Sequence, residues 1–388
     1  MSPLTTPSLE RLVFPVYVCS PNQALEDGMG LRRTLLSSPV VTALTTPHGV
    51  DRYLELVNPM WAVHEVRARV EDVHREAPGV ATLTLRPTGG WDGAVAGQHV
   101  QLGVLVDGVR RTRCFSLSSS EHRGDGRVTV TVKCHDEGYV SRYLAGEVPV
   151  GTVVHLSPAE GEFTLPQPRP ERLLFVSGGS GITPVMAMLR TLGDEGYAGS
   201  ATFLHYARSA EDTIFATELA ERAGGSGFAD INVVHTRADG GALSGRFDVA
   251  HLRAVAPDFA QIPTYVCGPA GLVGSVQQVY DEAGAREHLR VEHFKTPPIA
   301  ADPGAEGTVE FRRSGLHSSN SGQTLLEQAE SAGLSPAYGC RMGICKSCTT
   351  RKSEGLVRNV VNGAESSLPD EDIQICVSAP VGSCALDL

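Results

Sequence analysis

Long apolar runs, charge runs of one sign and a leader-like start are all lacking in this chain of 388 residues. Without a run of about 18 apolar residues, the sequence predicts no membrane-spanning helix. The net charge is −11 with no extended basic stretch, which argues against a nucleic-acid surface and a polybasic membrane tether. Residues 1–10 lack the positively charged start and apolar stretch of a secretory signal, so we expect a cytoplasmic protein.

Paired cysteine motifs are also scarce. Only Cys345 and Cys348 form a C-x2-C pair, whereas a structural zinc site usually takes two such pairs. A disulfide framework is typical of small, core-poor domains in oxidising compartments, and this chain is long enough for roughly two to four domains with their own cores. We therefore expect reduced thiols at the scattered positions Cys19, Cys114, Cys134, Cys267 and Cys384.

The remaining cysteines have the spacing of an iron–sulfur site. Cys340, Cys345 and Cys348 follow the pattern C-x4-C-x2-C, and Cys376 stands well downstream, as in the ligand set of a plant-type [2Fe-2S] cluster. Gly343 lies within the loop, where the backbone has to pass close to inorganic sulfide. These four cysteines are the predicted metal ligands, with Cys348 and Cys376 on the inner iron.

The first half of the chain predicts an extension followed by a β-domain. Residues 1–62 are predicted to form a helical N-terminal extension, with short helices at 30–36 and 49–57. Packing explains this extension better than docking to a partner or membrane surface, because basic residues are few. Alternation of apolar and polar residues then predicts a small antiparallel β-barrel over 63–167. Its expected strands include 63–70, 80–85, 99–104 and 128–132.

The second half predicts two further domains, so the fold class is multidomain. Residues 171–295 hold apolar runs without alternation, separated by helix-length segments, which indicates an α/β domain with a parallel sheet. A Pro- and Ala-rich stretch at 296–307 is the expected linker. Residues 308–388 open with a strand at 308–312 and an amphipathic helix at 324–331 before the cysteine loop, which indicates an α+β domain.

Two stretches of the barrel have the residue types of a flavin site. Arg113, Cys114, Phe115 and Ser116 end a strand: the arginine suits a pyrophosphate, the aromatic ring suits a flat ring system, and the serine can bond its edge. Gly138, Val140 and Ser141 begin a turn and short helix whose amides and hydroxyl suit an anion. A chance arginine-rich strand and a helix that covers the barrel mouth are the alternatives.

In this order the two stretches resemble the R-x-[YF]-S and G-x-x-S-x-x-L motifs of the ferredoxin–NADP reductase superfamily. The family's G-G-x-G-I-T-P turn, which lies under the nicotinamide nucleotide, is matched at every position. Its glycines would let the backbone approach phosphate, Thr183 would cap the following helix, and Pro184 fits the first helical turn. The matching residues are Gly178, Gly179, Gly181, Thr183 and Pro184.

The family's C-G-P motif is matched by Cys267, Gly268 and Pro269. The resemblance places Cys267 at the site of hydride transfer, where its thiol would orient the nicotinamide without covalent chemistry; a buried cysteine at a strand end is the alternative. Glu292 and Phe294 resemble the closing E-x-F stretch, whose aromatic residue covers the flavin. The catalytic residues expected from the resemblance are Cys267, Thr183, Ser116 and Glu292.

Three arginines bear on the choice of nucleotide. Arg208, Arg237 and Arg246 follow the second and third strands of the α/β domain and resemble the set that grips the 2′-phosphate in bacterial members of the family. No acidic residue stands directly after the second strand to take a ribose diol, although Glu211 and Asp212 are near. We expect NADPH, with NADH as the alternative, unless these are ordinary solvated arginines.

The order of the three domains resembles the reductases of the phthalate dioxygenase reductase and hybrid-cluster-protein reductase type. The resemblance implies a β-grasp fold for the C-terminal domain. FAD is expected in preference to FMN because the helix at 138–144 supplies an extra pyrophosphate site, although the phthalate-type members use FMN. Residues 47–54 look like the extension of actinobacterial acyl-CoA desaturase reductases. The expected function is electron transfer from NADPH through FAD and a [2Fe-2S] cluster to a partner oxygenase, fatty-acid desaturase or P450. A redox sensor without turnover is the alternative.

Overall fold

The computed structural model describes residues 41, 45, 49–106, 109–135, 138–225, 227–237, 243–294, 304–339, 341–343 and 346–388. The chain divides into two units, Met1–His64 and Glu65–Leu388. In the first unit, the expected helix at 49–57 is α3 (Val50–Val57), and the Asp51 carboxylate accepts the backbone N–H of Val63 at 2.6 Å. The helix predicted at 30–36 and most of the predicted linker at 296–307 lie outside the described residues.

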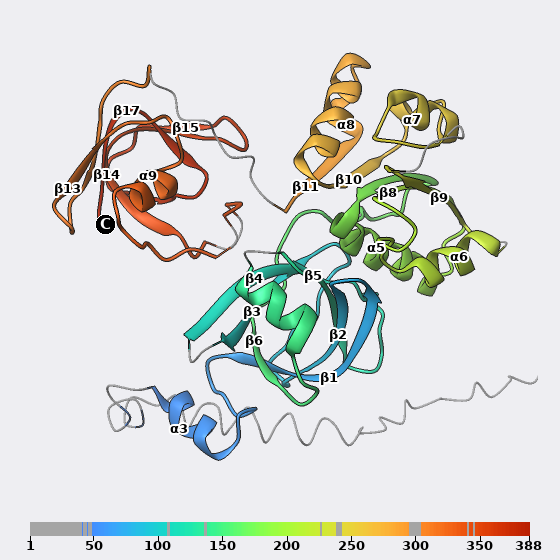
Figure 1. Ribbon diagram of the computed structural model, residues 1–388, viewed down its shortest axis with the longest axis horizontal. Coiled ribbons are helices and arrows are strands. Elements are labelled where there is room, and N and C mark those ends of the chain that lie inside the picture. The colour runs from blue at the N-terminus through green and yellow to red at the C-terminus, as the bar shows by residue number, and fades with distance from the viewer. Residues whose placement is uncertain are drawn as a thin grey trace, which may run out of the picture. The chain divides into compact units, whose positions relative to one another are not determined.

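An antiparallel sheet begins the second unit, as predicted (Figure 1). Its strand order is β4-β3-β6-β1-β2-β5, and a bridge between Leu117 and Val130 joins the two edges. Alternate side chains fill its core, as the sequence pattern requires. The strands are β1 (Val66–Ala77), β2 (Val80–Pro87), β3 (His99–Val106), β4 (Val109–Ser116), β5 (Val128–Lys133) and β6 (Val153–Leu156).

The first strand differs from the prediction at both ends. It begins at Val66 instead of residue 63 and continues to Ala77 instead of ending at residue 70. The register with β2 shifts between Val70 and Asp72, and again between Arg75 and Ala77. Each shift interrupts the two-residue alternation, so the pattern in the sequence stops where the strand does not.

The predicted parallel sheet follows, with strand order β11-β10-β7-β8-β9. One face packs on α5 (Ile182–Asp194) and α6 (Ala216–Gly224), and the other packs on α7 (Val249–Val255) and α8 (Ala270–Glu282). Because both faces are covered, the strands read as continuous apolar runs. They are β7 (Arg172–Gly178), β8 (Ser200–Ala207), β9 (Ala229–His235), β10 (Thr264–Gly268) and β11 (Leu289–His293).

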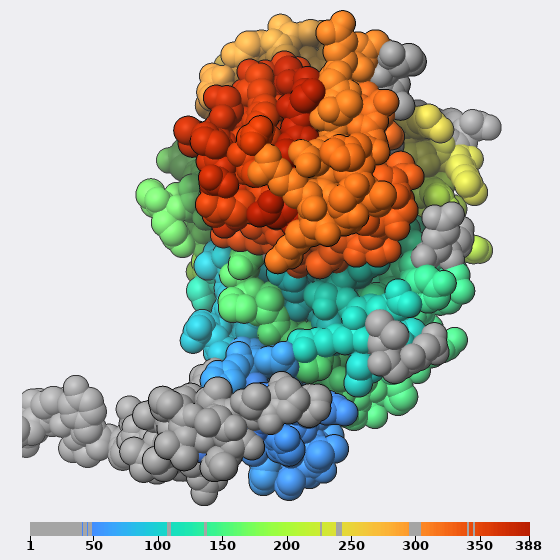
Figure 2. Space-filling model, turned by 90° about the vertical axis from the view of Figure 1, so that its left-hand side faces the viewer, coloured from blue at the N-terminus to red at the C-terminus, as the bar shows by residue number. Residues whose placement is uncertain are grey.

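The C-terminal domain is α+β, as predicted. Its mixed sheet has the order β13-β12-β17-β14-β15, β16 pairs with β14, and only the pairing of β12 with β17 is parallel. The expected helix at 324–331 is α9 (Leu325–Ser331), with Thr324 as its cap. In Figure 2 this domain forms one closely packed surface, coloured orange to red. Its strands are β12 (Thr308–Phe311), β13 (Leu316–Ser319), β14 (Thr349–Asn359), β15 (Glu365–Ser366), β16 (Glu371–Gln374) and β17 (Ser378–Leu386).

No helix in the described part of the chain is long and apolar enough to span a membrane.

Candidate functional site

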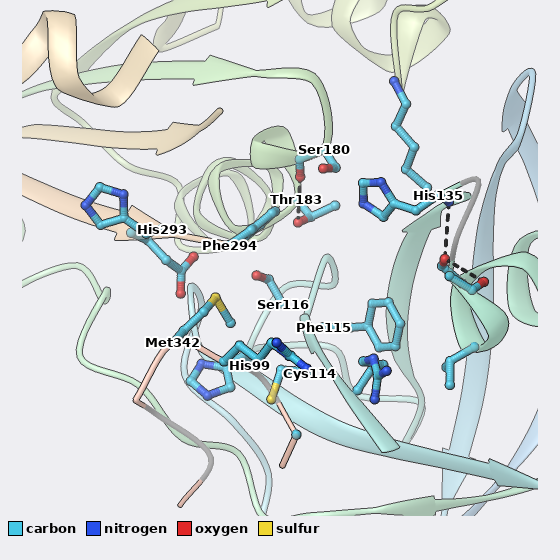
Figure 3. A pocket seen from close by; sticks show the side chains of 18 of the residues that line it. His99, Cys114, Phe115, Ser116, His135, Ser180, Thr183, His293, Phe294 and Met342 are labelled. Atoms are coloured by element: carbon cyan, nitrogen blue, oxygen red, sulfur yellow. Dashed lines mark hydrogen bonds between the residues drawn. The ribbon is translucent and has the colours of Figure 1, made fainter. Parts of the chain in front are cut away.

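A cavity of about 620 Å³ brings together motifs that lie far apart in the sequence. Figure 3 shows Ser116 at the end of β4, Thr183 on α5 and Phe294 after β11 around the same space. The volume lies within the range of about 300–1,000 Å³ that is usual for small-molecule and cofactor sites. Its lining includes the predicted residues Arg113, Cys114, Phe115, Ser116, Gly138, Val140, Ser141, Thr183, Glu292 and Phe294.

The end of β4 presents Arg113 and Ser116 to this cavity. Ser116 is almost fully buried and pairs in register with His99 on β3. The Arg113 guanidinium donates to the backbone carbonyl of Thr112 at 2.8 Å and lies 5.6 Å from the centre of the Tyr338 ring. A buried hydroxyl and a cation in one lining are the groups that a flavin nucleotide needs at its ring edge and its phosphates.

The Gly138–Ser141 turn is stabilised by hydrogen bonds of the Ser141 side chain to the nearby backbone. The Ser141 hydroxyl accepts the backbone N–H of His135 at 3.2 Å and donates to the Gly138 carbonyl at 3.2 Å. A Cβ at Gly138 would lie 2.3 Å from the Ser141 hydroxyl oxygen, so glycine is required there. Helix α4 (Tyr139–Arg142) has only four residues and continues as a π-helical turn, Tyr143–Glu147.

The glycine-rich turn differs from the prediction at Thr183. A 3-10 turn over Gly179–Gly181 precedes α5, so Gly181 occupies the cap position and Thr183 is already inside the helix. The Thr183 hydroxyl donates to the Ser180 carbonyl at 3.0 Å and is therefore not the predicted N-cap. Pro184 lies in the first turn of α5, as predicted.

Two of the turn glycines pack closely against the C-G-P segment. A Cβ at Gly181 would lie 2.2 Å from the Cys267 carbonyl oxygen, and a Cβ at Gly178 would lie 3.0 Å from Pro269. Gly268 approaches equally closely, since its Cβ would lie 3.0 Å from the Gly178 nitrogen. Gly179 is different, because it has a left-handed φ of +54° and open space around its Cβ position. Of these glycines, Gly179 is the one with room for a ligand.

Cys267, which is fully buried, and Glu292, which is partly buried, form a pair beside the cavity. They are register partners on β10 and β11, and the Cys267 thiol donates to the Glu292 carboxylate at an S–O distance of 3.8 Å. Burial raises the pKa of the Glu292 carboxyl to about 8 and raises the pKa of the Cys267 thiol. Both groups are therefore neutral near pH 7, which suits contact with an uncharged ring. Glu292 lines the cavity, whereas Cys267 lies directly behind it in the core.

The three predicted arginines lie together at the carboxyl edge of the parallel sheet. Arg208 follows β8, and its carbonyl accepts the Arg237 backbone N–H at 3.1 Å. The Gly245 N–H bonds the His235 carbonyl at 3.2 Å, which brings Arg246 to the same edge. All three side chains are exposed, and within the described ranges none of them makes an ion pair with a carboxylate. Their guanidinium groups are thus available to an anion.

Two of the four predicted cluster ligands fall within the described residues. Cys348 and Cys376 are buried, and the Ile375 N–H bonds the Cys348 carbonyl at 3.4 Å, so these two segments lie side by side. Cys340 and Cys345 lie outside the described residues. A Cβ at Gly343 would come within 2.7 Å of the Val377 side chain, so this glycine lets the loop pack tightly beside the Cys376 segment.

Several residues that line the cavity were not among those predicted from the sequence. Tyr338 and Met342 reach the cavity from the cysteine loop, and His99 and His135 reach it from the barrel. The Tyr338 ring lies 4.0 Å from the Arg341 guanidinium in addition to its contact with Arg113. No short motif links these positions, because they meet only through the packing of separate domains.

Comparison with known proteins matches all three domains. Residues 71–165 match the oxidoreductase FAD-binding domain, residues 175–278 the oxidoreductase NAD-binding domain, and residues 313–381 the 2Fe-2S iron-sulfur cluster binding domain. These matches support FAD, NAD(P)H and a [2Fe-2S] cluster as the cofactors, and the cavity and the two buried cysteines fit such groups.

Individual relatives span most of the chain. An NADPH oxidoreductase of Mycobacterium tuberculosis is 40% identical over 358 residues, which cover 90% of this chain and 91% of that protein. A stachydrine N-demethylase reductase subunit of Rhizobium meliloti is 29% identical over 329 residues, covering 79% of this chain and 92% of the relative. The structure of phthalate dioxygenase reductase aligns with a TM-score of 0.57 at 24% identity, over 84% of this chain and 98% of its own.

Proposed function

The chain belongs to the family of oxidoreductases that join an FAD-binding, an NAD-binding and a [2Fe-2S] domain, and we propose that it passes electrons from NADPH to a separate oxygenase, fatty-acid desaturase or P450. The observation that carries the proposal is the shared cavity, which is lined by residues of the barrel, the nucleotide domain and the cysteine loop. A redox sensor would have no need of a nicotinamide site that opens toward the other two domains.

Each part of the cavity has a role in this proposal. A bound flavin would supply the exchange between two-electron and one-electron chemistry. Arg113 would hold its pyrophosphate, Ser116 would bond the ring edge, and Phe294 would cover the ring. Cys267 and Glu292, neutral and in contact with each other, would orient the nicotinamide.

The partner protein is proposed from the relatives and from the cysteine loop. Relatives named as reductase subunits serve demethylase and monooxygenase systems, and a similar acceptor is proposed for this chain. Lys346 is exposed on the loop, in a left-handed conformation with φ of +54°, and offers a positive charge near the cluster. Asp370 and Asp372, which lie within 4 Å of Arg351, offer the opposite charge elsewhere on the domain.

Anaerobic reduction of the purified holoprotein tests whether the protein is an enzyme that takes electrons from NADPH. NADPH is expected to bleach the flavin and then the cluster, and a soluble one-electron acceptor is expected to restore both spectra. If neither NADPH nor NADH bleaches the flavin while dithionite does, the redox-sensor hypothesis replaces the proposed enzyme function.

The proposed preference for NADPH depends on Arg208, Arg237 and Arg246. Replacing Arg208 or Arg237 by Ala removes a charged hydrogen bond to the 2′-phosphate, so we expect the KM for NADPH to rise about tenfold per variant. The KM for NADH should stay unchanged, because NADH has no phosphate there. Arg290→Ala is a matched control, since Arg290 is an exposed arginine near the start of β11. An equal rise for both nucleotides would contradict the proposed preference.

A further inference from the structure

Four polar residues form a continuous row across adjacent strands of the parallel sheet. In register, Glu292 pairs with Cys267, Cys267 pairs with Ser177, and Ser177 pairs with His205. Register partners in a parallel sheet point to the same face, so the four side chains lie side by side near the carboxyl ends of β11, β10, β7 and β8. Glu292 and Cys267 belong to the proposed nicotinamide site, whereas Ser177 and His205 are not part of that site.

Ser177 and His205 are joined by a short buried hydrogen bond. The Ser177 hydroxyl oxygen lies 2.7 Å from Nδ1 of His205, and both residues are fully buried. Burial lowers the pKa of the His205 imidazole to about 3, so the ring is neutral and offers Nδ1 to the serine either as donor or as acceptor.

Packing alone does not account for this pair. Phe203, two residues earlier on the same face, is apolar and contributes to the core, as is usual for a sheet covered on both sides. Nε2 of His205 is buried and has no hydrogen-bond partner among the described residues. Such an unpaired group lowers stability, so an apolar side chain would serve the core better.

Ser177 connects its hydrogen bond with His205 to the glycine-rich turn. Ser177 directly precedes Gly178, where the glycine-rich turn begins, and it lies between Cys267 and His205 in the row. We infer that Ser177 and His205 are positioning residues that fix the end of β7, and with it the glycine-rich turn, against Cys267. This inference rests on the proposed function, in which that turn and Cys267 orient the nicotinamide for hydride transfer.

Two substitutions of His205 separate positioning from packing. His205→Phe keeps the ring volume beside Phe203 but removes the bond to Ser177, whereas His205→Asn keeps a polar nitrogen or oxygen near the Nδ1 position. We expect the rate of flavin reduction by saturating NADPH to fall about tenfold in His205→Phe and to stay within about twofold of the wild type in His205→Asn. The KM for NADPH should change little, because the arginines that bind its phosphate are untouched.

The matched control lies next in the chain. The Tyr206 hydroxyl bonds Nδ1 of His251 at 3.1 Å on the opposite face of the same strand, so Tyr206→Phe also removes one buried hydrogen bond from β8. Its rate of flavin reduction should equal that of the wild type even if its Tm falls.

Two results would overturn the inference: equal rates in His205→Phe and wild type, or equal losses in His205→Phe and Tyr206→Phe. Failure of the wild type itself to be reduced by NADPH would instead overturn the proposed function. Reduction by dithionite, which needs no nucleotide site, should be the same in all the proteins.

Discussion

Glu292 is a residue whose charge state changes on folding. Burial raises its pKa from the ordinary 4.5 to about 8, so between these values the folded protein holds a proton that the unfolded chain releases. The free energy of unfolding therefore falls as the pH rises through this window. Glu292→Gln has no such proton, so we expect its stability relative to the wild type to improve by about 4 kcal/mol from pH ~5 to pH ~9, since each pKa unit corresponds to about 1.4 kcal/mol.

Calorimetric Tm values of the holoprotein at both pH values measure this difference. Glu282→Gln is the control, because Glu282 is an exposed carboxylate at the end of α8 and its replacement should shift Tm equally at both pH values. A Glu292→Gln effect that did not change with pH would show that the carboxyl is not protonated in the folded state.

Among the helices, α9 has the clearest local determinants. The Thr324 hydroxyl oxygen accepts the Glu327 backbone N–H, and the Glu327 carboxylate accepts the Thr324 N–H at 3.0 Å, which forms a complete capping box. The Leu326 N–H bonds the Ile375 carbonyl at 3.0 Å, next to the predicted cluster ligand Cys376. Thr324→Ala removes the cap and should cost about 1 kcal/mol, which lowers the temperature of cluster loss by about 4–8 °C.

Loss of visible iron–sulfur absorbance on heating measures this effect. Ser335→Ala, at an exposed serine beyond the helix, is expected to leave that temperature unchanged. If Thr324→Ala also left it unchanged, the cap would not contribute to holding the Cys376 segment.

The elements show which parts of the structure could be predicted from the sequence. The amphipathic pattern at 324–331 and the glycine-rich turn are local, and helix α9 and the turn before α5 lie where these patterns predict them. The N-cap prediction for Thr183 is wrong because a 3-10 turn precedes α5. The strand predicted at 63–70 ends before β1 does, because the register shifts of β1 break the alternation. His205 was missed because its role depends on strand register, which only the folded sheet defines.

At the scale of the whole molecule, Tyr338 joins the iron–sulfur domain to the barrel. Its ring lies 4.0 Å from the Arg341 guanidinium on its own domain and 5.6 Å from the Arg113 guanidinium on the barrel. Ser347 makes a second contact, with its hydroxyl 3.4 Å from the side-chain oxygen of Gln101. Cation–π contacts of this kind contribute about 0.5–1 kcal/mol each at exposed sites, so the ring stabilises the contact between the two domains.

Tyr338→Ala removes that ring and should loosen the contact between the cysteine loop and the cavity. Because Cys267, Glu292 and the three predicted phosphate-binding arginines are unchanged, we expect flavin reduction by NADPH to keep its wild-type rate, while the following reduction of the cluster slows by about tenfold. Stopped-flow spectra resolve the two steps, since flavin and cluster absorb differently. Tyr338→Phe keeps the ring over both guanidiniums and should restore the second step. If cluster reduction were unchanged in Tyr338→Ala, the contact with Arg113 would not be the arrangement in which electrons cross between the domains.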